Sequence, residues 1–479
     1  MLRVLSDLFC ISKTQTNNDV TTMCKTPTLR SAHPLESIRV KRDGTQGVLE
    51  IAFKKEQLHE EPLFFLFLID VSASMDEDEK LICVQETLIH MIHMLNKTIK
   101  STTTQVYLQV DTFSTSIHSI IPTTQITQEN LAQLCDDIWR KIRLFNFTNF
   151  EVALRHAAQV LLQHRKDHPS HRMMHFFFTD GNANTGNVVP TFLATLVPPD
   201  IVGSYHFYMG IGEAHNSIVL HACAQNPRSE YWFISDSPHI QIVADEILHK
   251  ILYSAAGPLK ISVHDSSSAL FYDWQNNTWS NTVSETHLLD SDMTKRIHVR
   301  WNILPDKVIS DYLRIMLEID DCIFGIDIRI VKDPKAIVYI FQQQLMHLLF
   351  RCQKYAMKVL QYDDEDEDDD EDNDDDPDNS QILQKQLSAL HRRLKNFPLD
   401  HPLLEVLQQD CKYAFEKLGT YSGILFSNSR LTFFGVHQVY TPRSESKKRK
   451  CIQNDGSEKE DHEDNASICI YNISQDNPR

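Results

Sequence analysis

The chain has 479 residues, of which 42% are hydrophobic and 23% charged. Those proportions exclude a chain that is disordered throughout, and the length predicts roughly two to four domains. The formal net charge is −18, but 14 of the acidic residues lie in one run from Asp363 to Asp378, so the rest of the chain carries only −4. This near balance excludes a domain-wide basic surface, and we expect no nucleic-acid partner.

The cysteine spacing and the apolar runs indicate where the protein is located in the cell. The ten cysteines are widely separated and include no CxxC pair, so we expect reduced thiols in an intracellular protein. Asp7 interrupts the apolar opening Met1–Lys13, which argues against a signal peptide. The longest apolar run, Pro62–Ile69, is far shorter than the roughly 20 residues of a membrane helix. We therefore predict a cytoplasmic protein without a membrane partner.

The N-terminal part has little apolar pattern before residue 36. We predict that residues 1–35 are disordered or poorly ordered. Between Glu36 and Lys54 apolar residues alternate around the dipeptide Asp43-Gly44, which predicts two strands joined by a turn. We expect this segment, residues 36–56, to pair with a later β-rich domain.

Residues 62–255 alternate between short apolar runs and amphipathic stretches. This pattern is typical of an α/β domain, a doubly wound and mostly parallel sheet with helices on both faces. Buried parallel strands are apolar on both sides, as these runs are. The predicted strands are Leu63–Ile69, Val106–Phe113, Met173–Phe178, Ile201–Ile211 and Tyr231–Ile234, and the predicted helices are Lys80–Asn96, Thr148–Gln163, Ser217–Ala224 and Ile240–Tyr253.

The C-terminal half predicts a β-rich part and then a helical part. Residues 258–333 contain several alternating runs, and we predict a β-sandwich-like flanking domain there. Residues 334–362 and 380–425 have helical periodicity, and residues 363–379 between them predict an acidic disordered loop, because so dense a charge block does not remain compact. The acidic run is interpreted as a solvated spacer, with a basic protein partner as the alternative.

The polar tail, residues 441–479, is predicted to be disordered. It contains four consecutive basic residues, Lys447, Lys448, Arg449 and Lys450, which form a candidate nuclear-import signal. Nuclear entry is therefore the alternative to a purely cytoplasmic location.

A cluster of oxygen-bearing side chains follows the first predicted strand of the α/β domain. Asp70, Ser72 and Ser74 form an Asp-x-Ser-x-Ser motif at the carboxyl edge of the sheet, where open α/β sheets bind ligands. In extended chain these three side chains point the same way. Thr148 opens a later helix, and Asp180, before Gly181, ends a later strand. Magnesium prefers hard oxygen ligands of these kinds, so the five residues predict a metal site.

The order Asp-x-Ser-x-Ser, Thr, Asp-Gly resembles the metal-ion-dependent adhesion site (MIDAS) of the von Willebrand factor A (vWA) and integrin I-domain superfamily. The resemblance implies that Ser72, Ser74 and Thr148 offer hydroxyls to Mg²⁺ or Mn²⁺, while Asp70 and Asp180 bind directly or through water. It also implies an open coordination position filled by a Glu or Asp of a partner protein. Family members commonly have glycines just before the Thr, whereas Asn146 and Phe147 stand here. Because bulky residues disfavour positive φ, we expect an altered loop.

Residues Tyr205–Ile234 and Ile240–Leu259 resemble intracellular vWA proteins of plants, protists and large DNA viruses, in which β-rich and helical parts follow the A domain. Some plant relatives carry a RING finger and act as ubiquitin ligases, but the lack of CxxC pairs argues against that activity here. We predict a non-enzymatic adaptor that binds a partner protein through the metal. The alternatives are a substrate-delivery subunit of a ubiquitin-system or chaperone-type complex and a viral structural component. The oligomeric state is not predicted.

Other sites are disfavoured by the sequence. His164, His168, His171 and His175 lie close together, but Pro169 breaks any helix that would align them, so we do not predict zinc. The glycines of the segment 181–187 lack the Lys-Ser/Thr of a phosphate loop. No Gly-x-Ser-x-Gly motif is present for nucleophilic hydrolysis.

Overall fold

A computed structural model describes most of the chain between residues 35 and 437. The described residues are 35–53, 61–101, 104–198, 201, 203–234, 239–256, 259–263, 269–285, 287–290, 294–301, 311–319, 322–362 and 379–437. The predicted disordered N-terminus and tail, almost the whole acidic run and the candidate nuclear-import signal lie outside these residues, apart from Leu35 and Asn379 at the edges. The chain divides into two compact units. Unit 1 comprises residues 1–56, 255–285 and 289–343, and unit 2 comprises 57–254, 286–288 and 344–479.

Unit 2 contains a six-stranded sheet in the order β5-β4-β3-β6-β7-β8. All neighbouring strands are parallel except the edge pair β4 and β5. The central strand β3 is buried along its whole length, because its neighbours on both sides and the helices above and below cover it. The strands are β3 (Leu63–Asp70), β4 (Val106–Phe113), β5 (Ile117–Gln125), β6 (Arg172–Thr179), β7 (Ser204–Ile211) and β8 (Ser229–Ile234).

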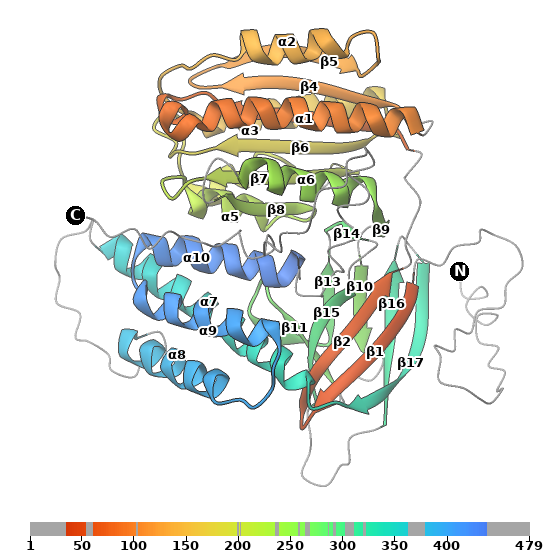
Figure 1. Cartoon of the computed structure of the whole chain (residues 1–479), viewed down its shortest axis with the longest axis vertical. Coiled ribbons are helices and arrows are strands. Elements are labelled where there is room, and N and C mark those ends of the chain that lie inside the picture. The colour runs from red at the N-terminus through yellow and green to blue at the C-terminus, as the bar shows by residue number, and fades with distance from the viewer. Residues whose placement is uncertain are drawn as a thin grey trace, which may run out of the picture. The chain divides into compact units, whose positions relative to one another are not determined.

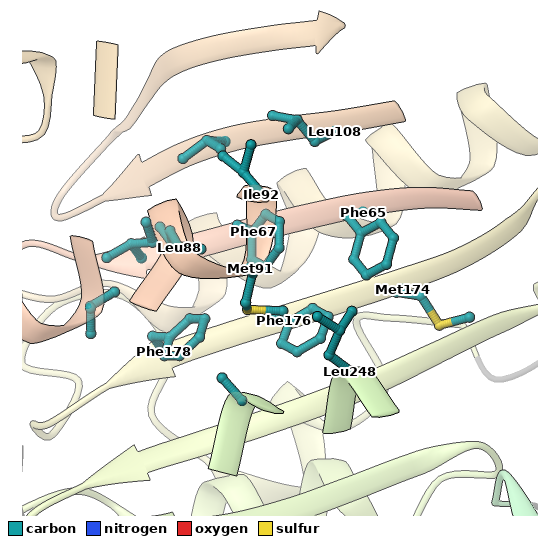
Figure 2. Close-up of a cluster of buried hydrophobic side chains, with 14 of the residues drawn as sticks. Phe65, Phe67, Leu88, Met91, Ile92, Leu108, Met174, Phe176, Phe178 and Leu248 are labelled. Atoms are coloured by element: carbon teal, nitrogen blue, oxygen red, sulfur yellow. The ribbon is translucent and has the colours of Figure 1, made fainter. Parts of the chain in front are cut away.

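Helices cover both faces of this sheet (Figure 1). One face packs against α1 (Lys80–Ser101), α2 (Leu131–Lys141) and α6 (His239–Leu252). The opposite face packs against α3 (Phe150–Asp167), α4 (Pro190–Leu193) and α5 (Ser217–Ala224). Figure 2 shows the first core, where Phe65, Phe67, Phe176 and Phe178 of the strands meet Leu88, Met91 and Ile92 of α1 and Leu248 of α6. Such aromatic burial fixes the strand ends rigidly, since interiors pack as densely as crystals.

Helices follow in the C-terminal part of the chain. They are α7 (Ala336–Tyr362), which begins in unit 1 and continues in unit 2, α8 (Ser380–Lys395), α9 (Pro402–Glu416), α10 (Tyr421–Thr432) and the π-helical turn η2 (Phe433–His437). Helix α10 lies beside β8 and α5 (Figure 1). The Tyr421 hydroxyl donates a hydrogen bond to the His215 carbonyl at 2.6 Å, and buried Arg430 pairs with Asp410 at 2.7 Å. The helical part is thereby joined to the loop between β7 and α5.

Unit 1 contains a nine-stranded sheet in the order β12-β11-β15-β2-β1-β17-β16-β10-β13. Among the strand pairings of this sheet that the structure describes, only that of β1 with β17 is parallel. The hairpin from β1 to β2 turns at Gly44, whose φ of +60° is a conformation that glycine adopts without strain. The strands are β1 (Leu35–Asp43), β2 (Gln46–Phe53), β10 (Leu259–Val263), β11 (Leu270–Asp273), β12 (Thr278–Ser280), β13 (Thr282–Glu285), β15 (Thr294–Arg300), β16 (Tyr312–Ile319) and β17 (Cys322–Lys332), while β9 (Ser254–Ala256) and β14 (Leu289–Asp290) form a separate ladder.

The predicted fold class is confirmed. The sheet of unit 2 is mostly parallel with helices on both faces, and a β-rich part and C-terminal helices accompany it. The sequence pattern did not predict β5, α2 or the short helix α4. Strand β5 is the exposed, antiparallel edge of the sheet and contains Pro122, so it lacks the continuous apolar run of the inner strands. Among the described helices, none is both long and apolar enough to cross a membrane.

Candidate metal centre

Asp70 ends β3 in the middle of the sheet and is fully buried. Its Oδ1 accepts a hydrogen bond from the backbone N–H of Ser72 at 2.9 Å, and its Oδ2 accepts one from the Thr179 hydroxyl at 2.6 Å. Burial raises the pKa of Asp70 to about 6, although these hydrogen bonds oppose the increase. A buried carboxylate of this kind is stabilised by any cation that reaches it.

Ser72 and Ser74 connect Asp70 with Asp180 through hydrogen bonds. The two serine hydroxyls are 3.2 Å apart, and the Ser74 hydroxyl donates to Asp180 Oδ1 at 2.8 Å. The structure therefore brings four of the five predicted ligands into one hydrogen-bonded group, in which the Ser72 backbone N–H is the link to Asp70. The group lies where β3 and β6 end, two parallel neighbours whose carboxyl ends meet at the same edge.

Asp180 comes directly after β6 and is fully buried. Gly181 follows it, and a Cβ at that position would come within 3.4 Å of the Ser74 hydroxyl, so glycine keeps the space beside the serine open. The Gly181 carbonyl accepts a hydrogen bond from Asn216 N at 3.1 Å, which fixes the loop against the segment after β7. Lys80 donates to Asp180 Oδ2 at 2.8 Å.

Thr148 lies in the loop between α2 and α3. Within the part of the chain that the structure describes, no direct hydrogen bond joins it to the other four residues. The same loop is tied to the strand of Asp70, because Phe145 N donates to the Val71 carbonyl at 2.6 Å. Thr148 N donates to Asn184 Oδ1 at 2.8 Å, and the Thr148 carbonyl accepts from Asn184 N at 3.0 Å. The buried threonine is thus held between the end of β3 and the loop that follows Asp180.

Phe147 adopts a backbone φ of +66°, in the left-handed region. The sequence predicted an altered loop here, because bulky residues disfavour positive φ. Instead, Phe147 takes the conformation that glycine adopts easily, at a typical cost of about 1–2 kcal/mol for an L-residue. The residue is 58% exposed, so burial of the ring compensates for only part of this cost.

The segment between Ser74 and α1 is also strained. The short helix η1 (Ala73–Glu79) contains a kink, and both Asp78 and Glu79 have positive φ, at 52° and 55°. Four consecutive acidic residues, Asp76 to Glu79, are exposed there, whereas the following Lys80 is buried. The kink therefore turns the lysine inward while the carboxylates face solvent.

Exposed apolar side chains gather in two loops near the candidate site. Leu144, Phe145 and Phe147 precede Thr148, and Val188 and Val189 lie in the loop after β6. Glu151 Oε2 accepts a hydrogen bond from Asn187 N at 2.9 Å, so the second loop is held at the start of α3, close in the chain to the first. Contiguous exposed apolar surface is a frequent sign of an interaction site.

The sequence pattern did not indicate Thr179 or Lys80 as residues of the candidate site. Each contacts an aspartate more than 90 residues away in the chain, so no local motif contains the contact. One signal was available for Lys80. A lysine at the start of a helix is electrostatically disfavoured, because the helix dipole is positive there, and this suggests a specific acidic partner.

The histidines of α3 come closer together than predicted. Helix α3 ends at Asp167, and the following turn brings His168 and His171 back to His164, with ring centroids 4.6–5.1 Å apart. His164 Nε2 lies 3.0 Å from His171 Nδ1. His175 is separate, since it pairs with His206 inside the sheet. In the described residues no group of three or more His, Cys, Asp or Glu side chains is arranged to hold a metal.

Residues 66–245 match the family model of the von Willebrand factor type A domain. This part of the chain is a VWA domain. It contains five strands of the six-stranded sheet in full and most of β3, together with all five predicted ligands. The five residues that resemble a MIDAS motif therefore lie within the VWA domain, the kind of domain in which that motif occurs.

Several solved structures of VWA proteins are similar to parts of this chain. A von Willebrand factor type A protein from Catenulispora acidiphila has a TM-score of 0.52 at 12% identity, covering 78% of this chain and 84% of that one. The ArnB paralog VWA2 from Sulfolobus acidocaldarius has a TM-score of 0.47 at 14% identity, covering 84% and 98%. Proximal thread matrix protein 1 of the mussel byssus, solved with a zinc-occupied MIDAS motif, has a TM-score of 0.33 at 14% identity, covering 40% and 49%. No curated protein matches the sequence.

Proposed function

We propose that the VWA domain binds a divalent cation, Mg²⁺ or Mn²⁺, and uses it to capture an acidic side chain of a partner protein. Asp70, Ser72, Ser74, Thr148 and Asp180 would hold the cation. The observation that carries the proposal is the hydrogen-bonded series at the carboxyl edge of a parallel sheet: the Ser72 backbone N–H donates to Asp70, and the Ser72 and Ser74 hydroxyls lead on to Asp180.

The donor set fits a hard cation. It consists of two carboxylates and three hydroxyls, all oxygen ligands, which Mg²⁺ and Mn²⁺ prefer over nitrogen or sulfur. Asp70 and Asp180 are fully buried, and Ser72 and Thr148 are almost so. Two buried carboxylates so close together need positive charge nearby, which a divalent cation supplies.

When bound, the cation supplies an electrophilic position at which a carboxylate of a partner can bind. Two aspartates balance its charge without making the site negative, so the cation remains electrophilic toward an additional carboxylate oxygen. VWA domains are generally non-catalytic interaction modules, and we propose the same here: binding without bond cleavage.

The residues near the proposed metal site restrict which partner surfaces can bind there. Asp76 to Glu79 place four exposed negative charges close in sequence to Ser74, and these repel an acidic surface. The exposed Phe145 and Phe147 favour apolar contact. The proposed ligand is therefore a single Glu or Asp flanked by basic and apolar residues.

We propose that the protein is an intracellular adaptor whose β-rich and helical parts add contacts, in line with the resemblance to intracellular vWA proteins of plants, protists and large DNA viruses. Membership of a ubiquitin-system or chaperone-type complex, as a subunit that delivers substrates, and a role in a virus particle are the alternatives. The identity of the captured partner separates them.

Affinity capture tests the proposal. Wild type and Asp70→Ala are used as baits, each in Mg²⁺ and in EDTA, and bound proteins are identified by mass spectrometry. We expect a partner that wild type retains only in Mg²⁺ and that the variant does not retain in either buffer. Partners that bind equally to both baits in both buffers would contradict the proposal.

A further inference from the structure

The ammonium group of Lys80 lies among the proposed metal ligands. Its Nζ is 2.8 Å from Asp180 Oδ2 and 3.4 Å from the Ser74 carbonyl, and only 9% of the side chain is exposed. Asp180 thus shares its two oxygens between the Ser74 hydroxyl and a buried cation that belongs to the chain.

The backbone is strained in the way required to bring this lysine inward. Asp78 and Glu79 are consecutive non-glycine residues in the left-handed region. Such conformations persist only where the surrounding structure enforces them, and they are concentrated at functional sites. After this kink α1 begins at Lys80, whose stem passes the end of β7, since a Cβ on Gly212 would lie 3.8 Å from Lys80 Cε.

The charges of Asp70, Asp180 and Lys80 indicate a role for the lysine. Asp70 and Asp180 carry two negative charges, and Lys80 supplies one positive charge, so the group has a net charge of −1 without metal. A divalent cation at the same oxygens would be close to the ammonium, and like charges at short distance in a poorly solvated site repel strongly.

We propose that Lys80 is an internal counter-ion that competes with the divalent cation for Asp180 and thereby weakens metal binding. It also keeps Asp180 paired, and the oxygens assembled, when no metal is bound. The exposed carboxylate of Glu77 lies 3.8 Å from Lys80 Nζ, so the ammonium has a second partner to which it can move when metal binds to Asp180. This inference rests on the metal site of the proposed function.

The rival interpretation is an ordinary buried ion pair that only stabilises the fold. The same domain contains such a pair away from the proposed ligands, because buried Lys250 of α6 contacts buried Glu230 of β8. Lys250→Met is therefore a matched control for Lys80→Met. Both variants remove an ammonium from a buried carboxylate, but only one of them lies at the metal ligands.

The test measures Mn²⁺ affinity by calorimetry and the melting temperature in EDTA and in Mn²⁺. We expect Lys80→Met to bind Mn²⁺ at least tenfold more tightly than wild type. We also expect its melting temperature in EDTA to be lower than that of wild type, and added Mn²⁺ to raise its melting temperature by more. Lys250→Met should also melt below wild type in EDTA, but its Mn²⁺ affinity should equal that of wild type.

Lys80→Gln is the second variant. It retains a hydrogen-bond donor toward Asp180 without the charge, so it decides the question if the methionine variant does not fold. If wild type binds Mn²⁺ and the folded Lys80 variant binds it equally tightly or more weakly, the proposed role of Lys80 is wrong. The metal site itself is then still supported. Absence of Mn²⁺ binding in both wild type and the Lys80 variants would overturn the metal site, and this inference with it.

Discussion

The hydroxyl of Thr179 donates a hydrogen bond to Oδ2 of Asp70, 2.6 Å away, across the neighbouring strands β6 and β3. The other carboxylate oxygen, Oδ1, accepts from Ser72 N. Asp70 is therefore fixed from both sides before any ligand arrives. Groups that orient a metal ligand in this way commonly matter almost as much as the ligand itself.

Thr179→Val keeps the shape of the side chain but removes the donor to Asp70. We expect divalent metal affinity to fall roughly 10- to 100-fold, the usual effect of losing a group that orients a ligand. Calorimetric titration with Mn²⁺ measures it. Thr112→Val is the control, because that buried threonine on β4 bonds to the His118 carbonyl and not to a carboxylate. An equal affinity of Thr179→Val and wild type would contradict a positioning role for Thr179.

The strained loop before Thr148 gives a stability prediction. Phe147→Gly removes the left-handed strain of about 1–2 kcal/mol, against about 0.5–1 kcal/mol for the greater freedom of glycine in the unfolded chain. We expect the free energy of unfolding of this variant to equal that of wild type or to exceed it by up to about 1.5 kcal/mol. Denaturant unfolding measures the difference.

Phe145→Gly is the comparison for Phe147→Gly. Phe145 does not have positive φ, and its ring stacks on His118 with the centroids 4.7 Å apart. We expect this second variant to be destabilised. If both variants lost stability to the same extent, the strain assigned to Phe147 would be wrong.

Buried histidines predict a loss of stability in acid. Burial lowers the pKa of His206 and of His215 to about 4, and it lowers the pKa of His175 well below its usual value of 6.5. Because these folded-state values lie below the unfolded value, the stability that each neutral histidine contributes is complete above pH 6.5. It is lost as the pH falls from 6.5 toward 4, by about 2 kcal/mol per group at pH 5 for His206 and His215.

Melting temperatures at pH 8 and pH 5 test this prediction, with His206→Asn compared with wild type. Burial raises the pKa of Asp70 and of Asp410 to about 6, so these carboxyls oppose the effect in both proteins. The informative quantity is therefore the difference between the two proteins. We expect the variant to lose less stability than wild type between the two pH values, and an equal loss would count against His206.

The buried strands could be predicted because their chemistry is local. All eight residues of β3 are buried, and the sequence shows this as one continuous apolar run before Asp70. The oxygen-bearing residues at its end, Ser72 and Ser74, are readable for the same reason. Exposed edge strand β5 has no such run, since only two of its nine residues are buried.

The contacts that complete the site could not be predicted, because they depend on tertiary packing. Thr179 meets Asp70 only after β3 and β6 pair in register, and Lys80, which meets Asp180, directly follows two residues with positive φ. The conformation of Phe147 also runs against the preference of its residue type, which the surrounding loop overrides.

Direct titration of the full chain with Mg²⁺ and Mn²⁺ tests the central claim, with Asp70→Asn as the comparison. The asparagine has a similar shape but removes a buried charge, so we expect this variant to melt in EDTA at or above the temperature of wild type. Wild type should bind one cation per chain, and the folded variant should bind none at that site. Equal binding by the two proteins, or none by wild type, would contradict the assignment of Asp70 and its neighbours as a metal centre.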